Sequence, residues 1–127
     1  MAKFDESQII ITVETQFIEE NSIVEFNKYF FAYTVTIKNQ GIQSAQLISR
    51  HWIIENANHE IFEVKGQGVI GEQPIIKPGE SFTYTSGTEI DTPIGSMYGT
   101  YEMMTEDVKS FIAKIPKFQL NMPRTLH

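Results

Sequence analysis

Apolar and polar residues alternate with a period of two along much of the chain. Between residues 29 and 37 the odd positions are all large and apolar, whereas Ala32, Thr34 and Thr36 lie among the even positions. Because successive side chains of a strand point to opposite faces, this pattern predicts a strand with one buried face. Residues 9–18 show the same alternation more weakly.

Further apolar runs predict more strands. Residues 45–54 are apolar on both faces, with Leu47 and Ile53 on one face and Ile48, Trp52 and Ile54 on the other, which favours a central strand. Arg50 shares its face with Trp52. The remaining predicted strands cover residues 61–64, 81–85, 96–104 and 111–115.

Turn-forming residues separate these runs. Gly41, Asn58, Pro78 and Gly79 lie between them, and such residues preset the backbone angle φ or tolerate positive values of it. Several short strands separated by turns indicate an all-β sandwich or barrel. Residues 19–27 do not alternate, which fits either a short helical turn or an ordered loop.

Composition supports this fold class. The 127 residues include 50 that are Ile, Val, Thr or aromatic but only eight that are Ala or Leu, which excludes a helical bundle. No repeat or linker divides the chain, so we expect a single domain over residues 1–127 with a strand-rich core at about residues 9–120 and flexible termini. The absence of Cys excludes disulfides and thiolate metal sites.

Charge and hydropathy limit the classes of partner that the protein is expected to bind. Sixteen acidic and ten basic residues give a net charge of -6, and the basic residues are scattered singly. This pattern predicts no binding to nucleic acid or to an anionic membrane surface. No apolar run is long enough to cross a bilayer and no signal peptide precedes the domain, so we expect a cytoplasmic protein.

A glycine-rich segment carries the most conspicuous motif. Gly66, Gly68 and Gly71 match the pattern G-x-G-x-x-G. A dinucleotide site needs a helix directly after this pattern, and Pro74 and Pro78 exclude one. Two interpretations remain: the loop's amides bind a phosphate group, or the glycines let the chain pass close to neighbouring strands.

Metal and catalytic motifs are weak. His51 and His59 lack the spacing of a paired metal site, and the nearby carboxylates of residues 102–107 lack the spacing of a calcium loop. Ser86 precedes a glycine but lacks the preceding glycine of a nucleophile elbow. We therefore expect no metal site, no cofactor and no enzymatic activity.

Large apolar residues around the strand predicted at residues 96–104 suggest a binding surface. One face of a sandwich strand normally contacts water, and Tyr and Met are enriched in protein interfaces. A covering loop or the C-terminal tail is the alternative explanation. The candidate interface residues are Tyr84, Met97, Tyr98, Tyr101 and Met103.

Six segments follow one another along the chain: residues 31–37, 47–53, 66–74, 78–87, 95–102 and 115–118. In this order they resemble the bacterial ApaG family over about residues 9–120. The resemblance implies a fibronectin type III-like, immunoglobulin-like β-sandwich of seven or eight antiparallel strands. His59 and Val108 stand where the family has turn glycines, which puts the conformation of these two turns in question because positive φ is costly for Val.

The resemblance also implies a functional context. The family is associated with cobalt and magnesium efflux or resistance, related domains are attached to eukaryotic F-box proteins, and its glycine-rich segment has been likened to a pyrophosphate-binding loop. We therefore expect a non-enzymatic interaction module with an unidentified protein partner, or with a second copy in a homodimer. Binding of a phosphate ligand through Gly66, Gly68 and Gly71 is the alternative function.

Overall fold

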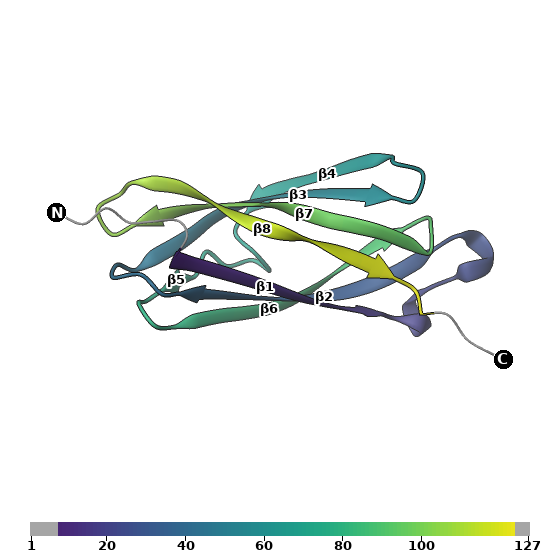
Figure 1. The fold of residues 1–127 in the computed structure, drawn as a ribbon, viewed down its shortest axis with the longest axis horizontal. Helices are drawn as coiled ribbons and strands as arrows, with labels where there is room; N and C mark the ends of the chain where they lie inside the picture. Colours follow the sequence, from purple (N-terminus) through teal and green to yellow (C-terminus); the bar gives the residue numbers. More distant parts are fainter. Residues whose placement is uncertain (1–7, 124–127) are drawn as a thin grey trace.

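The protein is a β-sandwich of two antiparallel sheets packed face to face (Figure 1). The computed structural model describes residues 8–123, so the prediction of flexible termini concerns residues that largely lie outside the described part. The predicted all-β, fibronectin type III-like sandwich is confirmed. Its strands are β1 (Ile9–Phe17), β2 (Tyr29–Asn39), β3 (Ala45–Asn56), β4 (Ile61–Gln67), β5 (Ile75–Ile76), β6 (Ser81–Ile90), β7 (Ile94–Thr105) and β8 (Ser110–Asn121).

The strands divide into a three-stranded and a five-stranded sheet. The first has the order β1-β2-β6; the second has the order β4-β3-β7-β8, with β5 also paired to β3. At one side of the sandwich β8 passes close to β1 (Figure 1), where the Thr15 hydroxyl donates to the Gln119 carbonyl at 3.3 Å. The opposite edges are β6 in the first sheet and β4 together with the short β5 in the second.

The alternation in β2 correctly identifies one side of the core. All five of its odd positions from Tyr29 to Ile37 are buried. An aromatic cluster continues the core across the sheets: the Trp52 ring centroid lies 5.3 Å from that of Tyr33 and 5.8 Å from that of Phe118. Edge-to-face contacts of this kind add stabilisation beyond area burial.

A bulge in β3 corrects the predicted assignment of its faces. Simple alternation puts Leu47 on the opposite face from Trp52 and Ile54, yet all three are buried in the core. The pairing of β3 with β7 shifts register between Leu47 and Ser49. The extra residue reverses the alternation, so the apolar positions before and after it reach the same face.

A second irregularity lies where β7 pairs with β8. The register shifts between Met97 and Gly99. At Gly99 a Cβ atom would lie 2.0 Å from the His51 carbonyl oxygen of β3, so only glycine fits this close approach of two backbones.

The segments that connect the strands can also be compared with the predictions made from the sequence. Residues 19–27 contain two short 3-10 helices, η2 (Glu19–Asn21) and η3 (Val24–Phe26). His59 and Val108 have φ angles of 64° and 61°, so both turns keep the left-handed conformation without glycine. The two-residue strand β5 was not predicted, because a segment this short shows no alternation.

Candidate functional site

The predicted interface residues lie mostly inside the protein. Tyr84, Met97, Tyr101 and Met103 are at most 5% exposed, so the interface prediction is wrong for these four. Met97, Tyr101 and Met103 face the opposite sheet from odd positions of β7, and Tyr84 is a buried residue of β6. Tyr98 is the exception: it is partly exposed on the outer face of β7.

The glycine-rich segment forms a tight crossover between β4 and β5. The Gly68 amide donates to the Ile48 carbonyl at 2.8 Å, and the Val69 and Glu72 amides donate to each other's carbonyls at 2.8 and 2.9 Å. A Cβ atom on Gly68 would lie 2.1 Å from the Glu72 carbonyl oxygen. This geometry supports the close-crossover interpretation, because these amides are engaged within the protein.

The other two glycines of the motif, Gly66 and Gly71, lie at different positions in the fold. Gly66 lies within β4 opposite Arg50, and Gly71 has a φ angle of 78° in the turn that follows. An anion bound near this loop would therefore need donors from other residues as well.

The two histidines within residues 8–123 bind different carboxylates. His51 Nε2 lies 2.9 Å from Glu63 Oε1, and His59 Nδ1 lies 2.9 Å from Glu55 Oε2. The hydrogen bond with His59 holds the pKa of the half-buried Glu55 carboxyl below its usual value. Within residues 8–123 no three His, Cys, Asp or Glu side chains gather closely enough to hold a metal ion.

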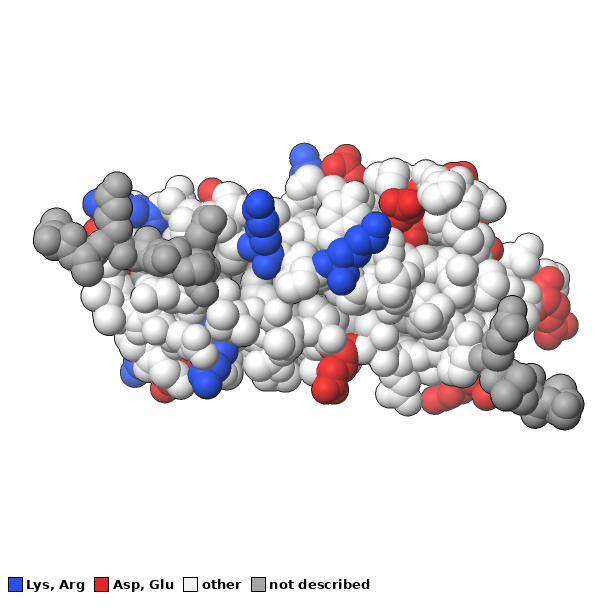
Figure 2. Space-filling view, in the orientation of Figure 1, with Lys and Arg blue, Asp and Glu red and all other residues white. Residues whose placement is uncertain are grey.

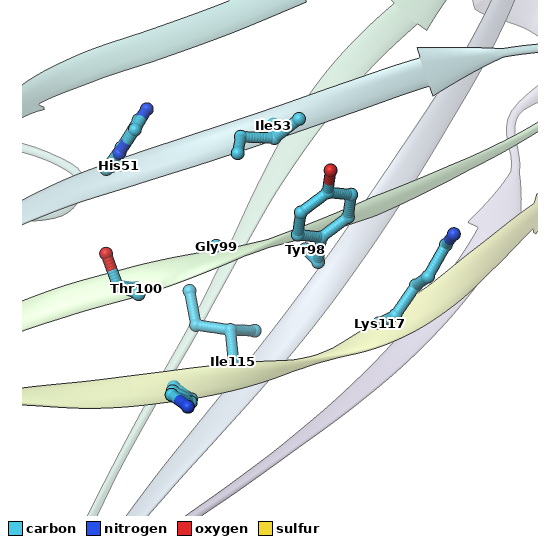
Figure 3. A pocket seen from close by; sticks show the side chains of 8 residues that line it. His51, Ile53, Tyr98, Gly99, Thr100, Ile115 and Lys117 are labelled. Atoms are coloured by element: carbon cyan, nitrogen blue, oxygen red, sulfur yellow. The ribbon is translucent and has the colours of Figure 1, made fainter. Parts of the chain in front are cut away.

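An apolar hollow of about 420 Å³ lies on the outer face of the five-stranded sheet (Figure 3). We call it the outer-face groove. Gly99, between Tyr98 and Thr100, is partly exposed at this point. The groove is lined by His51 and Ile53 from β3, Tyr98, Gly99 and Thr100 from β7, and Lys114, Ile115 and Lys117 from β8.

Tyr98 stands in the groove between β3 and β8. Figure 3 shows its ring between Ile53 and Lys117. Lys117 Nζ lies 5.5 Å from the ring centroid, within the range of a cation–π contact. The Tyr98 ring therefore has an apolar neighbour, Ile53, and a charged neighbour, Lys117.

The charge of the groove differs from that of the whole protein. Lys114 and Lys117 line it and no Asp or Glu does, although the chain as a whole has a net charge of -6. Figure 2 shows two basic side chains along β8, with acidic atoms beside one of them. Lys117 lies close enough to Glu55 for its charge to help lower the pKa of that carboxyl. Ile112, which is 45% exposed, lies two residues before Lys114 on the same side of β8 and extends the apolar surface.

A second hollow, of about 290 Å³, lies between the sheets, and we call it the inter-sheet cavity. Tyr84 lines it, and the hydroxyl of this residue forms a hydrogen bond with the Tyr101 hydroxyl. Burial raises the pKa of both phenols well above its usual value, so both stay neutral and protonated at neutral pH. The lining comprises Tyr33, Arg50, Trp52, Gln67, Val69, Ile70, Gly71, Tyr84 and Ser86.

Comparison with known proteins places the chain in a family. The model of the ApaG domain matches residues 19–105. The chain belongs to the ApaG family. ApaG proteins of Thiobacillus denitrificans (strain ATCC 25259 / T1) and Dechloromonas aromatica (strain RCB) are 51% and 52% identical to it, each over 127 residues and the full length of both chains.

Solved structures of similar proteins have the same fold. The crystal structure of the putative ApaA protein from Bordetella pertussis has a TM-score of 0.89 and 46% sequence identity to this ApaG-family chain, covering 92% of this chain and 95% of the other. An X-ray structure of a Northeast Structural Genomics Consortium target has a TM-score of 0.90 and 49% sequence identity, covering 96% of this chain and 92% of the other.

Within residues 8–123, no helix is long and apolar enough to cross a membrane.

Proposed function

We propose that this ApaG-family chain is a non-enzymatic, cytoplasmic protein-binding module whose outer-face groove binds an acidic segment of a partner protein. One observation carries the proposal: an apolar hollow on the sheet face is lined by Lys114 and Lys117 and by no carboxylate. The segment would place an apolar side chain against Tyr98 and its acidic groups beside the two lysines.

The lining suits this kind of binding. Tyr98 is an aromatic residue that Lys117 holds in place, so little conformational entropy is lost when it contacts a partner. Aromatic residues are frequent among the side chains that contribute most to binding energy. The lysines at the edge of the groove attract an acidic segment and disfavour a basic one.

Within this proposal, the link to cobalt and magnesium tolerance is indirect. The ApaG-family chain would act by binding a protein that handles these cations. The described histidines support this view, because each is paired with a single carboxylate, Glu63 or Glu55.

Charge reversal in the groove is expected to abolish partner binding. The Lys114→Glu/Lys117→Glu double variant places acidic groups where the partner's own would lie, and like charges at an interface are strongly unfavourable. The measurement is affinity capture from cell extract with the immobilised protein at physiological salt. The wild type is expected to retain a specific protein that the double variant loses and that higher salt releases.

A matched control carries the same change in net charge elsewhere. Lys38 and Lys77 are exposed residues on the outer side of β2 and in the turn before β6. The Lys38→Glu/Lys77→Glu variant is expected to retain the partner. Recovery of the same proteins by the groove variant, or of none by the wild type, would contradict the proposal.

A further inference from the structure

We propose that the free edge of β4 pairs with β4 of a second copy of this chain, so that the five-stranded sheets of two copies join across a twofold axis. β4 is an end strand of its sheet and is hydrogen-bonded to β3 alone among the strands of residues 8–123 (Figure 1). This contact is separate from the outer-face groove, so it does not depend on the proposed function.

The backbone groups of β4 point alternately toward β3 and away from it. At the two ends of the strand, the Asn56 amide donates to the Glu60 carbonyl at 3.2 Å, and the Gly68 amide donates to the Ile48 carbonyl at 2.8 Å. Even-numbered residues therefore bond to β3, and odd-numbered residues direct their N–H and C=O groups outward. The outward-directed residues are Ile61, Glu63, Lys65 and Gln67, whose carbonyl also accepts from Arg50 at 3.0 Å.

β4 lacks most of the features that prevent pairing at a sheet edge. An open row of N–H and C=O groups is a template for a further strand, and proteins commonly block it with proline, a bulge or a charged side chain. β4 contains no proline, and its register against β3 runs without a shift from Ile61 to Gln67. The charges of Glu63 and Lys65 are what remains, and they decide which strand can pair here.

Apolar side chains on the core side of β4 are left uncovered. Phe62 and Val64 are 47% and 42% exposed, although they lie opposite buried residues of β3. The end strand β6 of the other sheet differs, because none of residues 81–90 is a large apolar side chain that is exposed. Pairing of two β4 strands brings the exposed apolar side chains of both copies together and removes them from water.

The charges of β4 select one register and a second copy as the partner. Outward-directed residues must lie opposite one another, so an odd residue faces an odd one. With the twofold axis at Val64, all seven residues of β4 are paired, and Glu63 of each copy lies opposite Lys65 of the other. An axis at either charged residue instead places like charges opposite each other, which is unfavourable. The strand is therefore complementary to itself in the register that pairs its whole length.

The side chains on the core side are compatible with this register. Val64 of one copy faces Val64 of the other in the closer, non-hydrogen-bonded type of pair. Phe62 lies opposite Gly66 of the second copy, where guanidinium atoms of Arg50 lie 2.9 to 3.0 Å from the position of a Cβ. An aromatic ring stacks favourably on a guanidinium, and the glycine adds no side chain that would keep the ring away.

Sedimentation equilibrium measures this association directly. The wild type is expected to change from monomer to dimer as its concentration rises to about 500 µM, with a Kd of roughly 10–100 µM, because a contact along one strand is smaller than a stable interface. The amides of residues 61, 63, 65 and 67 are expected to become protected from hydrogen exchange as the dimer forms. A chain that stays monomeric, or a dimer in which these amides stay unprotected, would overturn the proposal.

Charge reversals test the register. Glu63→Lys and Lys65→Glu each place like charges opposite each other at two points, so each variant alone is expected to raise the Kd about tenfold or more. A mixture of the two variants is expected to dimerise like the wild type, because every lysine then faces a carboxylate. Both residues are exposed, so the variants are expected to fold, which circular dichroism verifies. A mixture that stays as weakly associated as its components would contradict the register.

A matched control separates this contact from a general effect of charge. Glu89 is exposed on β6, the end strand of the other sheet, and Glu89→Lys makes the same change in net charge as Glu63→Lys. Glu89→Lys is expected to leave the Kd within about twofold, since exposed distant charges are screened. Equal weakening by Glu89→Lys and Glu63→Lys, or unchanged association in both β4 variants, would show that the copies do not pair through β4.

Discussion

Replacement of Gly99 by Ala is expected to destabilise the protein by about 3 kcal/mol or more, at the upper end of the cost of overpacking. The new methyl group would lie 2.0 Å from the His51 carbonyl oxygen, which is backbone and has no alternative rotamer. Relief of this clash requires β3 and β7 to separate at the centre of the five-stranded sheet. The measurement is urea unfolding followed by the fluorescence of Trp52, with the midpoint compared to that of the wild type.

Gly66 offers a matched glycine control. There the nearest atoms to a new Cβ are the end of the Arg50 side chain, at 2.9 to 3.0 Å, and a flexible side chain can move. Gly66→Ala is therefore expected to cost no more than about 1 kcal/mol, as is common for point mutations. If Gly99→Ala and Gly66→Ala lowered the free energy of unfolding by the same amount, the close approach of β3 and β7 would not be the cause of the destabilisation.

Replacement of Asn39 by Leu is expected to cost about 3 kcal/mol, because each buried group left unsatisfied costs about 1–3 kcal/mol. The side chain is fully buried at the end of β2. It donates to the carbonyls of Gln43 and Ile76, at 2.7 and 2.9 Å, and accepts from the Gly41 amide at 2.8 Å. Leu has a similar size but leaves all three backbone groups without these bonds. Thermal unfolding by circular dichroism measures the loss.

Asn121, which is exposed at the end of β8, serves as the control. Asn121→Leu is expected to change the stability by no more than about 0.5 kcal/mol, as surface substitutions usually do. A variant at Asn39 that unfolds at the same temperature as the wild type would refute the structural role given to its three hydrogen bonds.

The fold was largely predictable because its signal is local. The alternation in β2 depends only on neighbouring residues, and it identified the buried face correctly from Tyr29 to Ile37. The failure in β3 has a local cause as well: one bulged residue near Ile48 reverses the alternation, and an apolar side chain there gives no sign of the irregularity. The prediction that Arg50 and Trp52 share a face was correct, because both lie beyond the bulge and line the inter-sheet cavity.

The candidate sites were not predictable to the same degree because they are assembled from distant segments. The outer-face groove joins residues of β3, β7 and β8, and of these only Tyr98 was selected from the sequence as an interface residue. Lys114 and Lys117 are three residues apart, and β8 has a register shift against β7 between them, so simple alternation does not place both beside the groove.

The most direct test of the proposed function is photo-crosslinking in cells from a benzoylphenylalanine at position 98, in place of Tyr98 in the outer-face groove. The matched control carries the same group at Thr85, an exposed residue on the outer side of the other sheet. We predict that position 98 crosslinks to one protein, that the crosslinked peptide is acidic and contains an apolar residue, and that Thr85 gives no such product. Equal crosslinking from both positions, or crosslinking from position 98 only to a second copy of this chain, would contradict the account.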